Sequence, residues 1–438
     1  MGLMYLPDTV YDIIFQFCGV YVTTSKLGVC CKYLHGAVKT YSELSVSLRF
    51  TDDELERICN YQLEAIYGLP REKVSMQWIL QLISVPRVFV IGGSEHARRC
   101  DVLDMSSGTW RQCGSLSVKR ERAFSAVQHN GYIYCISGSV DHAVQSVERL
   151  DVFTNRWTPV APLPHPVQSS GVVSYKNRII VIGGDCRRSY ERIDTVFAMK
   201  EDESEWADDF IPPLLIGRSE HAACIYRGKM WVAGGYLRGR GYPLVGSTSV
   251  EAYNEELGIW EECPSLNKDR KQFRLLVIRG VMYAVGGDCI GDKDTIEKYD
   301  EQTKTWIHLC DYPHKRKASC CTAIGNYIII FGGKREGGKG RLSGAHETYD
   351  VFCAIEGEWL SNNITKVCGR DAQGLLFPSK QGQVLSLNTL QDISPPRNTN
   401  PPIIKRHMKY LNLDLYKRSH GITNAAAVTY EYPCNLNW

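Results

Sequence analysis

The side chains able to do chemistry are scattered along the 438 residues and form no arrangement typical of an active site. No G-x-S-x-G nucleophile motif is present. Histidines that could bind a metal or transfer a proton stand singly in expected loops. They are His96, His142, His165, His221 and His314. The sequence therefore predicts no catalytic residue, no metal site and no cofactor.

Two further patterns favour structure over chemistry. Residues 333–339 approximate a phosphate-binding loop, but Gly340 stands where Ser or Thr is required, so we interpret them as a hairpin loop. The seventeen cysteines include no C-x-x-C pair and follow no secretory signal. We expect reduced and mostly buried thiols.

A repeated apolar strand supplies the framework. It ends in a glycine doublet at Gly92-Gly93, Gly183-Gly184, Gly234-Gly235, Gly286-Gly287 and Gly332-Gly333, with Ser137-Gly138 in the remaining place. A tryptophan follows each time, at Trp110, Trp157, Trp206, Trp260, Trp306 and Trp359. A repeat of about 50 residues with four strand-like runs matches one propeller blade, because a lone four-stranded sheet exposes two apolar faces that must stack.

Most of these tryptophans follow a Tyr-Asp-like step, found at Leu103-Asp104, Leu150-Asp151, Tyr253-Asn254, Tyr299-Asp300 and Tyr349-Asp350. The doublet, this step and the tryptophan, in this order, resemble the repeat of the kelch family. The resemblance implies an all-β six-bladed kelch β-propeller over residues 87–390, acting as a binding module rather than an enzyme. The first unit lacks a preceding strand, so we expect Gln373–Phe377 to pair with it and close the ring. Residues 391–438 are expected to form a linker and C-terminal tail.

Residues 1–50 predict a small N-terminal α-helical unit, with Pro7 suited to a first helical turn. The Leu-Pro entry, the aliphatic stripe behind it and the Val-Cys-x-Lys-x-Leu run resemble an F-box. That resemblance implies docking of a Skp-type adaptor, and so a cullin-type ubiquitin ligase. The adaptor-binding candidates are Leu6, Pro7, Val10, Ile13, Ile14, Leu27 and Leu34. Residues 51–86 are expected to form a helical connector.

Two other interpretations of this unit stay open. The helices could only pack against the propeller, or they could be a fragment of the BACK segment of BTB-kelch proteins. We expect no BTB domain upstream of Met1, which favours the F-box.

Arginines and lysines concentrate in two sets of loops. In an antiparallel blade, the loop after the second strand and the loop leading to the next blade emerge on the same side, so their charges add to one basic face. Such a face attracts acidic or phosphorylated protein segments. The candidate residues are Arg122, Arg218, Arg270 and Arg316 at the inner rim, with Arg98, Arg188, Arg238 and Arg335 around them.

Composition narrows the function classes. A 44% hydrophobic and 23% charged chain of net charge +3 is typical of soluble globular proteins. Residues 13–22 are too short to cross a membrane and follow acidic residues, so we expect a cytoplasmic protein, possible also in the nucleus, without a membrane partner. No interleaved aromatic pattern supports nucleic-acid binding. We favour a substrate receptor for ubiquitin ligation, with two rivals: a kelch scaffold such as an actin-binding protein, and an oxidoreductase with metal ligands in its channel.

Overall fold

The computed structural model describes residues 87–359 and the strand Ala426–Tyr430. Gaps in the first range fall at 94–96, 105–108, 131, 140–141, 153–154, 187–190, 201–203, 239–245, 288–293, 314–318, 325–326, 337–341 and 346–348. The described part is all-β and contains no helix.

Five repeats each fold into an antiparallel four-stranded blade from one continuous stretch of chain. The first contains β4 (Ser125–His129), β5 (Tyr132–Ile136), β6 (Val147–Asp151) and β7 (Arg156–Val160). The second contains β8 (Gly171–Tyr175), β9 (Arg178–Cys186), β10 (Glu191–Met199) and β11 (Trp206–Ala207). The third contains β13 (Ala222–Tyr226), β14 (Lys229–Ala233), β16 (Val250–Asn254) and β17 (Ile259–Cys263).

The last two contiguous blades follow the same plan. One contains β18 (Arg274–Ile278), β19 (Val281–Val285), β20 (Thr295–Asp300) and β21 (Thr305–Asp311). The other contains β22 (Cys320–Ile324), β23 (Tyr327–Phe331), β26 (Tyr349–Cys353) and β27 (Glu358–Trp359). Two small ribbons lie beside the blades and pair β12 (Arg218–Ser219) with β15 (Tyr236–Leu237), and β24 (Lys334–Glu336) with β25 (Leu342–Ala345).

The sheet of the first repeat combines strands from two distant parts of the chain. The repeat supplies β1 (Arg87–Ile91), β2 (Cys100–Asp104) and β3 (Thr109–Gln112), and the fourth strand is β28 (Ala426–Tyr430) from the far end of the sequence. β28 runs antiparallel to β1, with Phe89 opposite Val428. The predicted closing strand, Gln373–Phe377, lies outside the described residues. The partner of β1 is a segment that we had expected to be a tail.

The predicted fold class, a six-bladed propeller with an N-terminal α-helical unit, is therefore wrong as stated. The structure is a five-blade arrangement of contiguous blades, and the first repeat cannot form such a blade because its own stretch of chain contains only three of the strands. The helical unit has no support, since residues 1–50 and the connector lie outside the described part.

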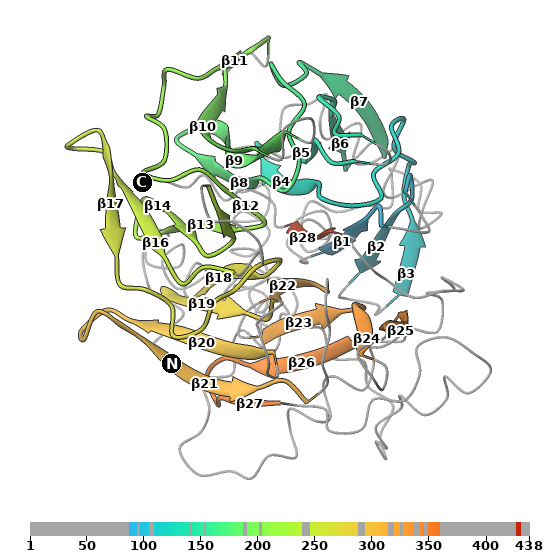
Figure 1. The fold of residues 1–438 in the computed structure, drawn as a ribbon. Coiled ribbons are helices and arrows are strands. Elements are labelled where there is room, and N and C mark those ends of the chain that lie inside the picture. The colour runs from blue at the N-terminus through green and yellow to red at the C-terminus, as the bar shows by residue number, and fades with distance from the viewer. Residues whose placement is uncertain are drawn as a thin grey trace, which may run out of the picture.

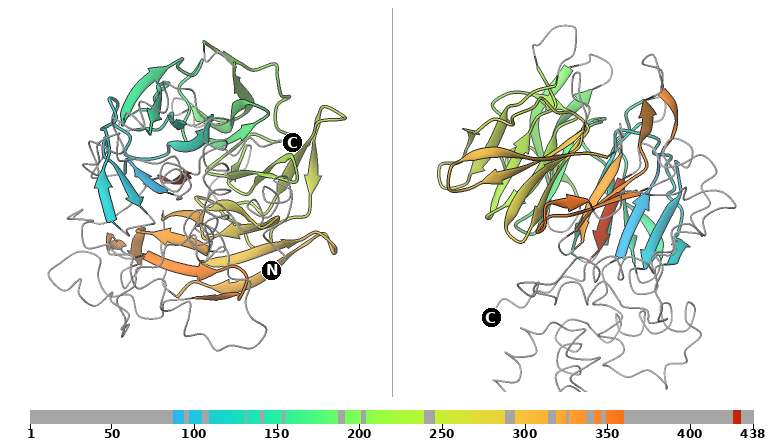
Figure 2. Two further views of the ribbon diagram at one scale, coloured as in Figure 1. Left: turned by 180° about the vertical axis from the view of Figure 1, so that it is seen from behind. Right: turned by 90° about the horizontal axis from the view of Figure 1, so that it is seen from below.

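The sheets are arranged in a ring with their first strands toward the centre (Figures 1 and 2). β28 completes the innermost layer, where it contacts β22 on one side and β4 on the other. The apolar core is divided among the spaces between neighbouring sheets, and one cluster joins Tyr226 and Trp231 of one blade to Tyr299 and Trp306 of the next. This explains the continuous apolar strands, because a stacked blade buries both of its faces.

The repeated tryptophans join neighbouring sheets. Five of the six repeat tryptophans donate a hydrogen bond from the indole N–H to a backbone carbonyl in or after the last strand of the preceding sheet. The five pairs are Trp157 with Gly114 at 2.8 Å, Trp206 with Ala161 at 2.9 Å, Trp260 with Pro212 at 2.9 Å, Trp306 with Pro264 at 2.9 Å and Trp359 with Asp311 at 3.0 Å.

Candidate functional site: the central channel and its mouth

Three buried arginines fix the loops that lead into the blades. Each guanidinium pairs with a carboxylate on the third strand of the blade that follows. The pairs are Arg120 with Glu148 at 3.2 Å, Arg218 with Glu251, and Arg270 with Glu297 at 2.7 Å. The same carboxylates accept a hydrogen bond from a loop N–H three residues before each arginine. These donors belong to Ser117, Leu215 and Asn267, at 2.8, 3.0 and 2.9 Å.

The same arginines also bind backbone. Arg270 Nη1 donates to the carbonyls of Gly286 at 2.5 Å and Thr295 at 2.9 Å, and Arg218 Nη1 donates to Gly234 at 3.0 Å. Burial lowers the pKa of Arg218, and the Glu251 carboxylate opposes this effect. A buried charge is tolerated when it is paired and hydrogen-bonded, and these three guanidinium groups are paired, although the Nε atoms of Arg120 and Arg218 have no partner among the described residues. The ion pairs and backbone contacts tie the entering loops to the blades.

This placement changes the predicted rim. Arg218 and Arg270 were expected to face a partner, but they are 1% and 0% exposed. Their guanidinium groups are enclosed by their own blades, so we do not include them in a binding surface. Arg122 was expected to be their equivalent, but the residue that makes the equivalent contacts is Arg120.

The backbone carbonyls of these arginines pack closely against the glycine doublets. A Cβ on Gly234 would lie 2.6 Å from the carbonyl oxygen of Arg270, and one on Gly183 would lie 2.7 Å from that of Arg218. The carbonyl of Arg270 accepts a hydrogen bond from Gly235 N–H at 2.7 Å. Each arginine thus contacts the preceding blade through its backbone and its own blade through its side chain.

Inside this framework, four residues form a hydrogen-bonded belt around one end of the channel. They stand just before the first strands of four successive blades and share a positive φ: Ala123 at 58°, Ser169 at 58°, Glu220 at 56° and Gln272 at 54°. Ser169 N–H donates to Ala123 O at 2.8 Å, Glu220 N–H to Ser169 O at 2.9 Å, and Gln272 N–H to Glu220 O at 2.9 Å. None is glycine, so the belt holds an uncommon backbone conformation that the surrounding contacts stabilise.

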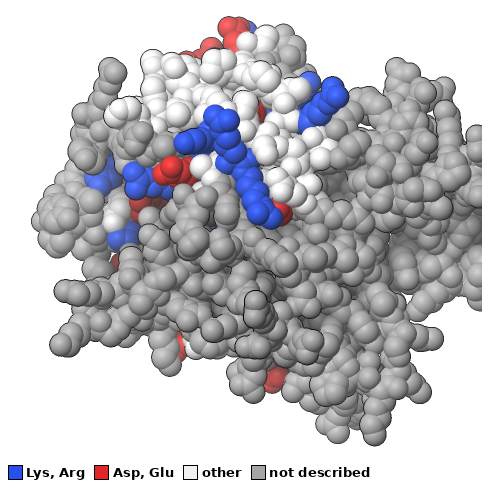
Figure 3. All heavy atoms as spheres, turned by 90° about the vertical axis from the view of Figure 1, so that its right-hand side faces the viewer, with Lys and Arg blue, Asp and Glu red and all other residues white. Residues whose placement is uncertain are grey.

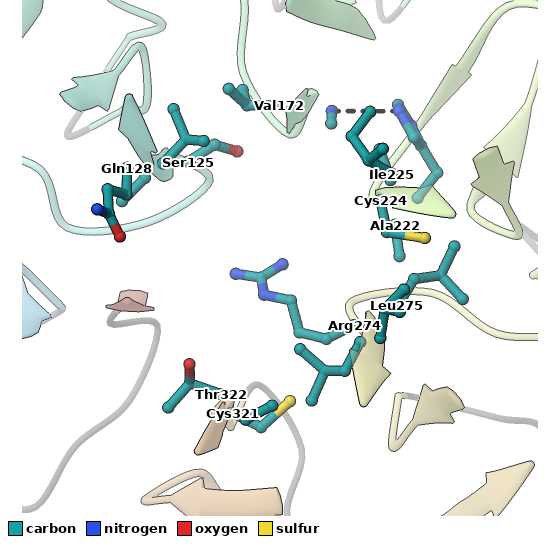
Figure 4. A pocket seen from close by; sticks show the side chains of 18 of the residues that line it. Ser125, Gln128, Val172, Ala222, Cys224, Ile225, Arg274, Leu275, Cys321 and Thr322 are labelled. Atoms are coloured by element: carbon teal, nitrogen blue, oxygen red, sulfur yellow. Dashed lines mark hydrogen bonds between the residues drawn. The ribbon is translucent and has the colours of Figure 1, made fainter. Parts of the chain in front are cut away.

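The four belt residues line part of the mouth of the channel. The mouth has a volume of about 170 Å³ and includes Arg122, Glu220, Gln272, Arg274 and Ser319. Below it lies a cavity of about 390 Å³ lined by β4, β8, β13, β18 and β22 (Figure 4). Ser125, Ser170, His221 and Arg274 line both spaces, so the mouth continues into the channel.

The remaining predicted arginines have different positions. Arg122 is exposed and lines the mouth. Its backbone pairs with that of Ser139, which follows the Ser-Gly doublet. The loop that leads into this blade therefore meets the loop that follows the blade's second strand. Arg98 is exposed, and Arg238 is exposed and pairs with Asp194 at 3.3 Å. The residues without a described side chain are Arg188, Arg316 and Arg335.

Basic and acidic side chains are mixed on the face that Figure 3 shows, where a short run of Lys and Arg lies beside Asp and Glu. A uniformly basic face is not what this view shows. The adaptor-binding candidates Leu6, Pro7, Val10, Ile13, Ile14, Leu27 and Leu34 all lie outside the described residues.

Ionisable groups beside the channel are held neutral. Burial, followed by the charge of Arg218, lowers the pKa of His221 to about 3, and its Nε2 accepts a hydrogen bond from Gly171 N–H at 3.1 Å. Burial raises the pKa of Cys321, which lines the channel, to about 12, so this thiol is protonated at neutral pH. The described cysteines are free.

Within the described residues, no group of three or more His, Cys, Asp and Glu side chains could hold a metal ion. In the same part of the chain, no helix is long and apolar enough to cross a membrane.

Sequence comparisons agree with the repeats. A sequence model of the Kelch motif matches residues 122–164 and 217–267. Kelch-like protein 23 of Homo sapiens is 26% identical over 208 residues, which cover 46% of this chain and 36% of the relative. Kelch-like protein 35 of Homo sapiens is 29% identical over 36% of this chain and 26% of the relative. Alpha-scruin of Limulus polyphemus is 27% identical over 42% of this chain and 21% of the relative.

The matched part thus spans about a third or less of the length of these relatives. The two Kelch motif matches lie over β4–β7 and β12–β17, and they include Ser137-Gly138 and Gly234-Gly235 with the tryptophans Trp157 and Trp260. The repeats, the ring of sheets and the similarity to kelch-like proteins together support the presence of kelch repeats in this chain.

Proposed function

We propose that this protein is a non-catalytic adaptor or scaffold that binds an acidic or phosphorylated segment of another protein at the channel mouth. The observation that carries the proposal is the convergence of loops from five blades on one opening that includes Arg122 and Arg274. Guanidinium groups form charge-assisted, often bidentate bonds with carboxylates and phosphates. Similarity to kelch-like proteins supports an interaction role in preference to catalysis.

A finer part of the proposal is that the bound protein is brought to a ubiquitin ligase. The F-box resemblance of residues 1–50 supports a role as substrate receptor of a cullin-type ubiquitin ligase, reached through a Skp-type adaptor. The Kelch motif matches lie in the blades, so the support for the ligase role is the sequence pattern of residues 1–50.

Segment binding is tested with the purified full chain on an array of acidic, phosphorylated and uncharged peptides. We expect acidic or phosphorylated peptides to bind, with an affinity that falls as salt is raised. Arg122→Ser should weaken binding about ten-fold, equivalent to about 1.4 kcal/mol. Arg156→Ser is the matched control, because Arg156 is also exposed but lies on the outer strand β7. Equal binding by both variants would place recognition elsewhere.

Ligase association is tested separately by pull-down with a purified Skp-type adaptor. We expect the intact chain to bind and a Leu6→Ala/Pro7→Ala variant not to bind, with unchanged unfolding of both. Peptide binding without adaptor binding would leave a kelch scaffold and reject the ligase role.

A further inference from the structure

Two cysteines face each other in the sheet of the first repeat. Cys100 begins β2, and Cys113 directly follows β3. The register that pairs Asp101 with Gln112 places Cys100 opposite Cys113, and the backbone N–H of Cys113 donates to the carbonyl of Cys100 at 2.8 Å. Opposite residues of an antiparallel pair share one face, and their Cα atoms are about 4.5–5.5 Å apart, within the range of about 4.4–6.8 Å that a disulfide spans.

The two side chains also interact. Both thiols are free; Cys100 is 0% exposed, whereas Cys113 is half-buried. Burial, followed by a hydrogen bond with the side chain of Cys113, raises the pKa of Cys100 well above its usual value. A dissolved oxidant therefore reaches Cys113 first, and the Cys100 thiol lies beside it.

The equivalent positions of other blades show that this pair is particular to the first sheet. Cys100 precedes the buried Asp101, and the residues that precede Glu148, Glu251 and Glu297 on the corresponding strands are aliphatic. Each faces a residue of the next strand, and the pairs are Val147 with Val160, Val250 with Cys263, and Ile296 with Cys310. Valine or isoleucine thus meets the packing requirement at the position of Cys100, and of these four sheets the first alone places two thiols face to face.

The pair lies where the first sheet is joined to the next blade. Gly114, the neighbour of Cys113, donates its N–H to Asn155 Oδ1 at 2.8 Å and accepts the indole N–H of Trp157 at 2.8 Å. The preceding strand, β3, is the outer strand of its sheet and pairs with β2. A covalent bond between Cys100 and Cys113 would fix both the outer strand and the start of the connection to the next blade.

We propose that Cys100 and Cys113 form a reversible disulfide when the protein meets a peroxide, and that this bond stabilises the first sheet. The Cys113 thiolate attacks one peroxide oxygen, the O–O bond breaks, and hydroxide leaves as Cys113 becomes a sulfenic acid. The Cys100 sulfur then attacks the Cys113 sulfur, the S–O bond breaks, and water leaves with the proton of Cys100. Two thiols and one hydrogen peroxide give one disulfide and two waters.

This proposal is independent of the proposed function. Neither Cys100 nor Cys113 lines the mouth or the channel. Binding of a protein segment at the mouth and oxidation of this pair can therefore be measured separately, and the failure of one would not decide the other.

The test treats the purified full chain with hydrogen peroxide, blocks the remaining thiols with N-ethylmaleimide and identifies disulfides by mass spectrometry of non-reduced peptides. We expect the Cys100–Cys113 link to form at least ten-fold faster than any disulfide of Cys263 or Cys310, and to disappear with dithiothreitol. Cys263 and Cys310 are the matched controls, because both are half-buried at the equivalent position but face an aliphatic residue.

Two variants reproduce pairs that the protein already contains. Cys100→Val gives the first sheet the pair seen at Val250 and Cys263, so it should abolish the link and leave Cys113 as a sulfenic acid. Dimedone should label Cys113 at least three-fold more in this variant than in the wild type. Cys113→Val gives the pair seen at Val147 and Val160, and it covers the case in which Cys100→Val does not fold.

Thermal unfolding of the oxidised and reduced protein measures the stabilising effect. Oxidation should raise the unfolding midpoint of the wild type by several degrees, because the link restricts the unfolded chain around residues 101–112, and it should not raise that of Cys113→Val. An unchanged or lower midpoint in the fully cross-linked wild type would overturn the stabilising role.

Three results of the mapping would overturn the disulfide itself. They are the absence of the Cys100–Cys113 link after peroxide treatment, a rate no higher than that of the disulfides of Cys263 and Cys310, and a link from either residue to Cys135 in its place. Cys135 is the informative competitor, because it is buried in the next blade and its charge also affects the pKa of Cys100.

Discussion

At the scale of single residues, charge is used in two ways in this protein. Arg120, Arg218 and Arg270 are enclosed and paired, and they hold loops, while Arg122 and Arg274 face the channel and its mouth. Burial and pairing, rather than residue type, decide which arginines are available to a partner.

The first prediction concerns the Arg270–Glu297 pair, in which both side chains are fully buried. Arg270→Ala should lower the free energy of unfolding by about 3–5 kcal/mol, because it leaves the Glu297 carboxylate buried without its cation. Lys268→Ala, a half-buried neighbour, should change it by less than about 1 kcal/mol. Urea unfolding measures both, and a loss below about 1 kcal/mol in Arg270→Ala would contradict the structural role.

A second prediction concerns pH and His221. Its native pKa of about 3 lies below its usual value of 6.5, so between these values the unfolded chain binds a proton that the native protein does not. The stability contributed by the neutral ring is fully present above pH 6.5 and is lost as pH falls toward 3, by at most about 1.4 kcal/mol per pH unit.

His221→Gln should therefore reduce the pH dependence of unfolding between pH 6 and 4.5. The exposed His142, replaced by Gln, is the control and should leave the slope unchanged. Urea titrations at successive pH values give the slopes, and identical slopes in wild type and His221→Gln would show that the native ring is already charged.

At the scale of elements, the residues that recur in each repeat are those that make contacts between neighbouring sheets. The third prediction compares two glycines with almost the same backbone conformation, Gly234 at φ 66° and Gly258 at φ 67°. A Cβ on Gly234 would meet Arg270 O at 2.6 Å, whereas one on Gly258 would meet nothing within 4 Å.

Both alanine variants carry the same left-handed strain, of about 1–2 kcal/mol. Gly234→Ala should in addition force apart two blades, so we expect it to be less stable than Gly258→Ala by roughly 2 kcal/mol or more. Chemical unfolding of the two variants measures the difference, and equal losses would mean that the contact between blades can relax freely.

Much of the arrangement of the strands into repeated sheets could be predicted from the sequence. The apolar strands, the doublets and the tryptophans predicted the repeated sheets, because these features recur with one period. The distinction between Arg120 and Arg122 could not be made by counting, since the loops between blades differ in length. A signal was present nonetheless: Glu148, Glu251 and Glu297 each interrupt an apolar strand just before the Leu-Asp or Tyr-Asp-like step. A repeated buried carboxylate requires a repeated buried cation.

At the scale of the whole molecule, closure depends on a segment that is distant in sequence. β28 pairs with β1 and contacts β4 and β22, so five residues near the C-terminus link the first and last repeats. Nothing local in the sequence marks this strand, because a single short apolar run gains its role only from the open edge it covers. The sequence placed the closing strand at Gln373–Phe377 for the same reason: several short runs could have served.

The fourth prediction tests this closure with two truncations of the full chain. Ending the chain after residue 425 removes β28, and ending it after residue 430 keeps the strand while removing the eight residues behind it. The shorter chain should expose the edge of β1, lower the unfolding midpoint by several degrees and associate in a concentration-dependent way, because an unpaired strand edge pairs with other chains. The longer chain should behave as the wild type in both respects. Thermal unfolding and sedimentation measure the two effects, and equal behaviour of the two truncations would show that another segment closes the ring.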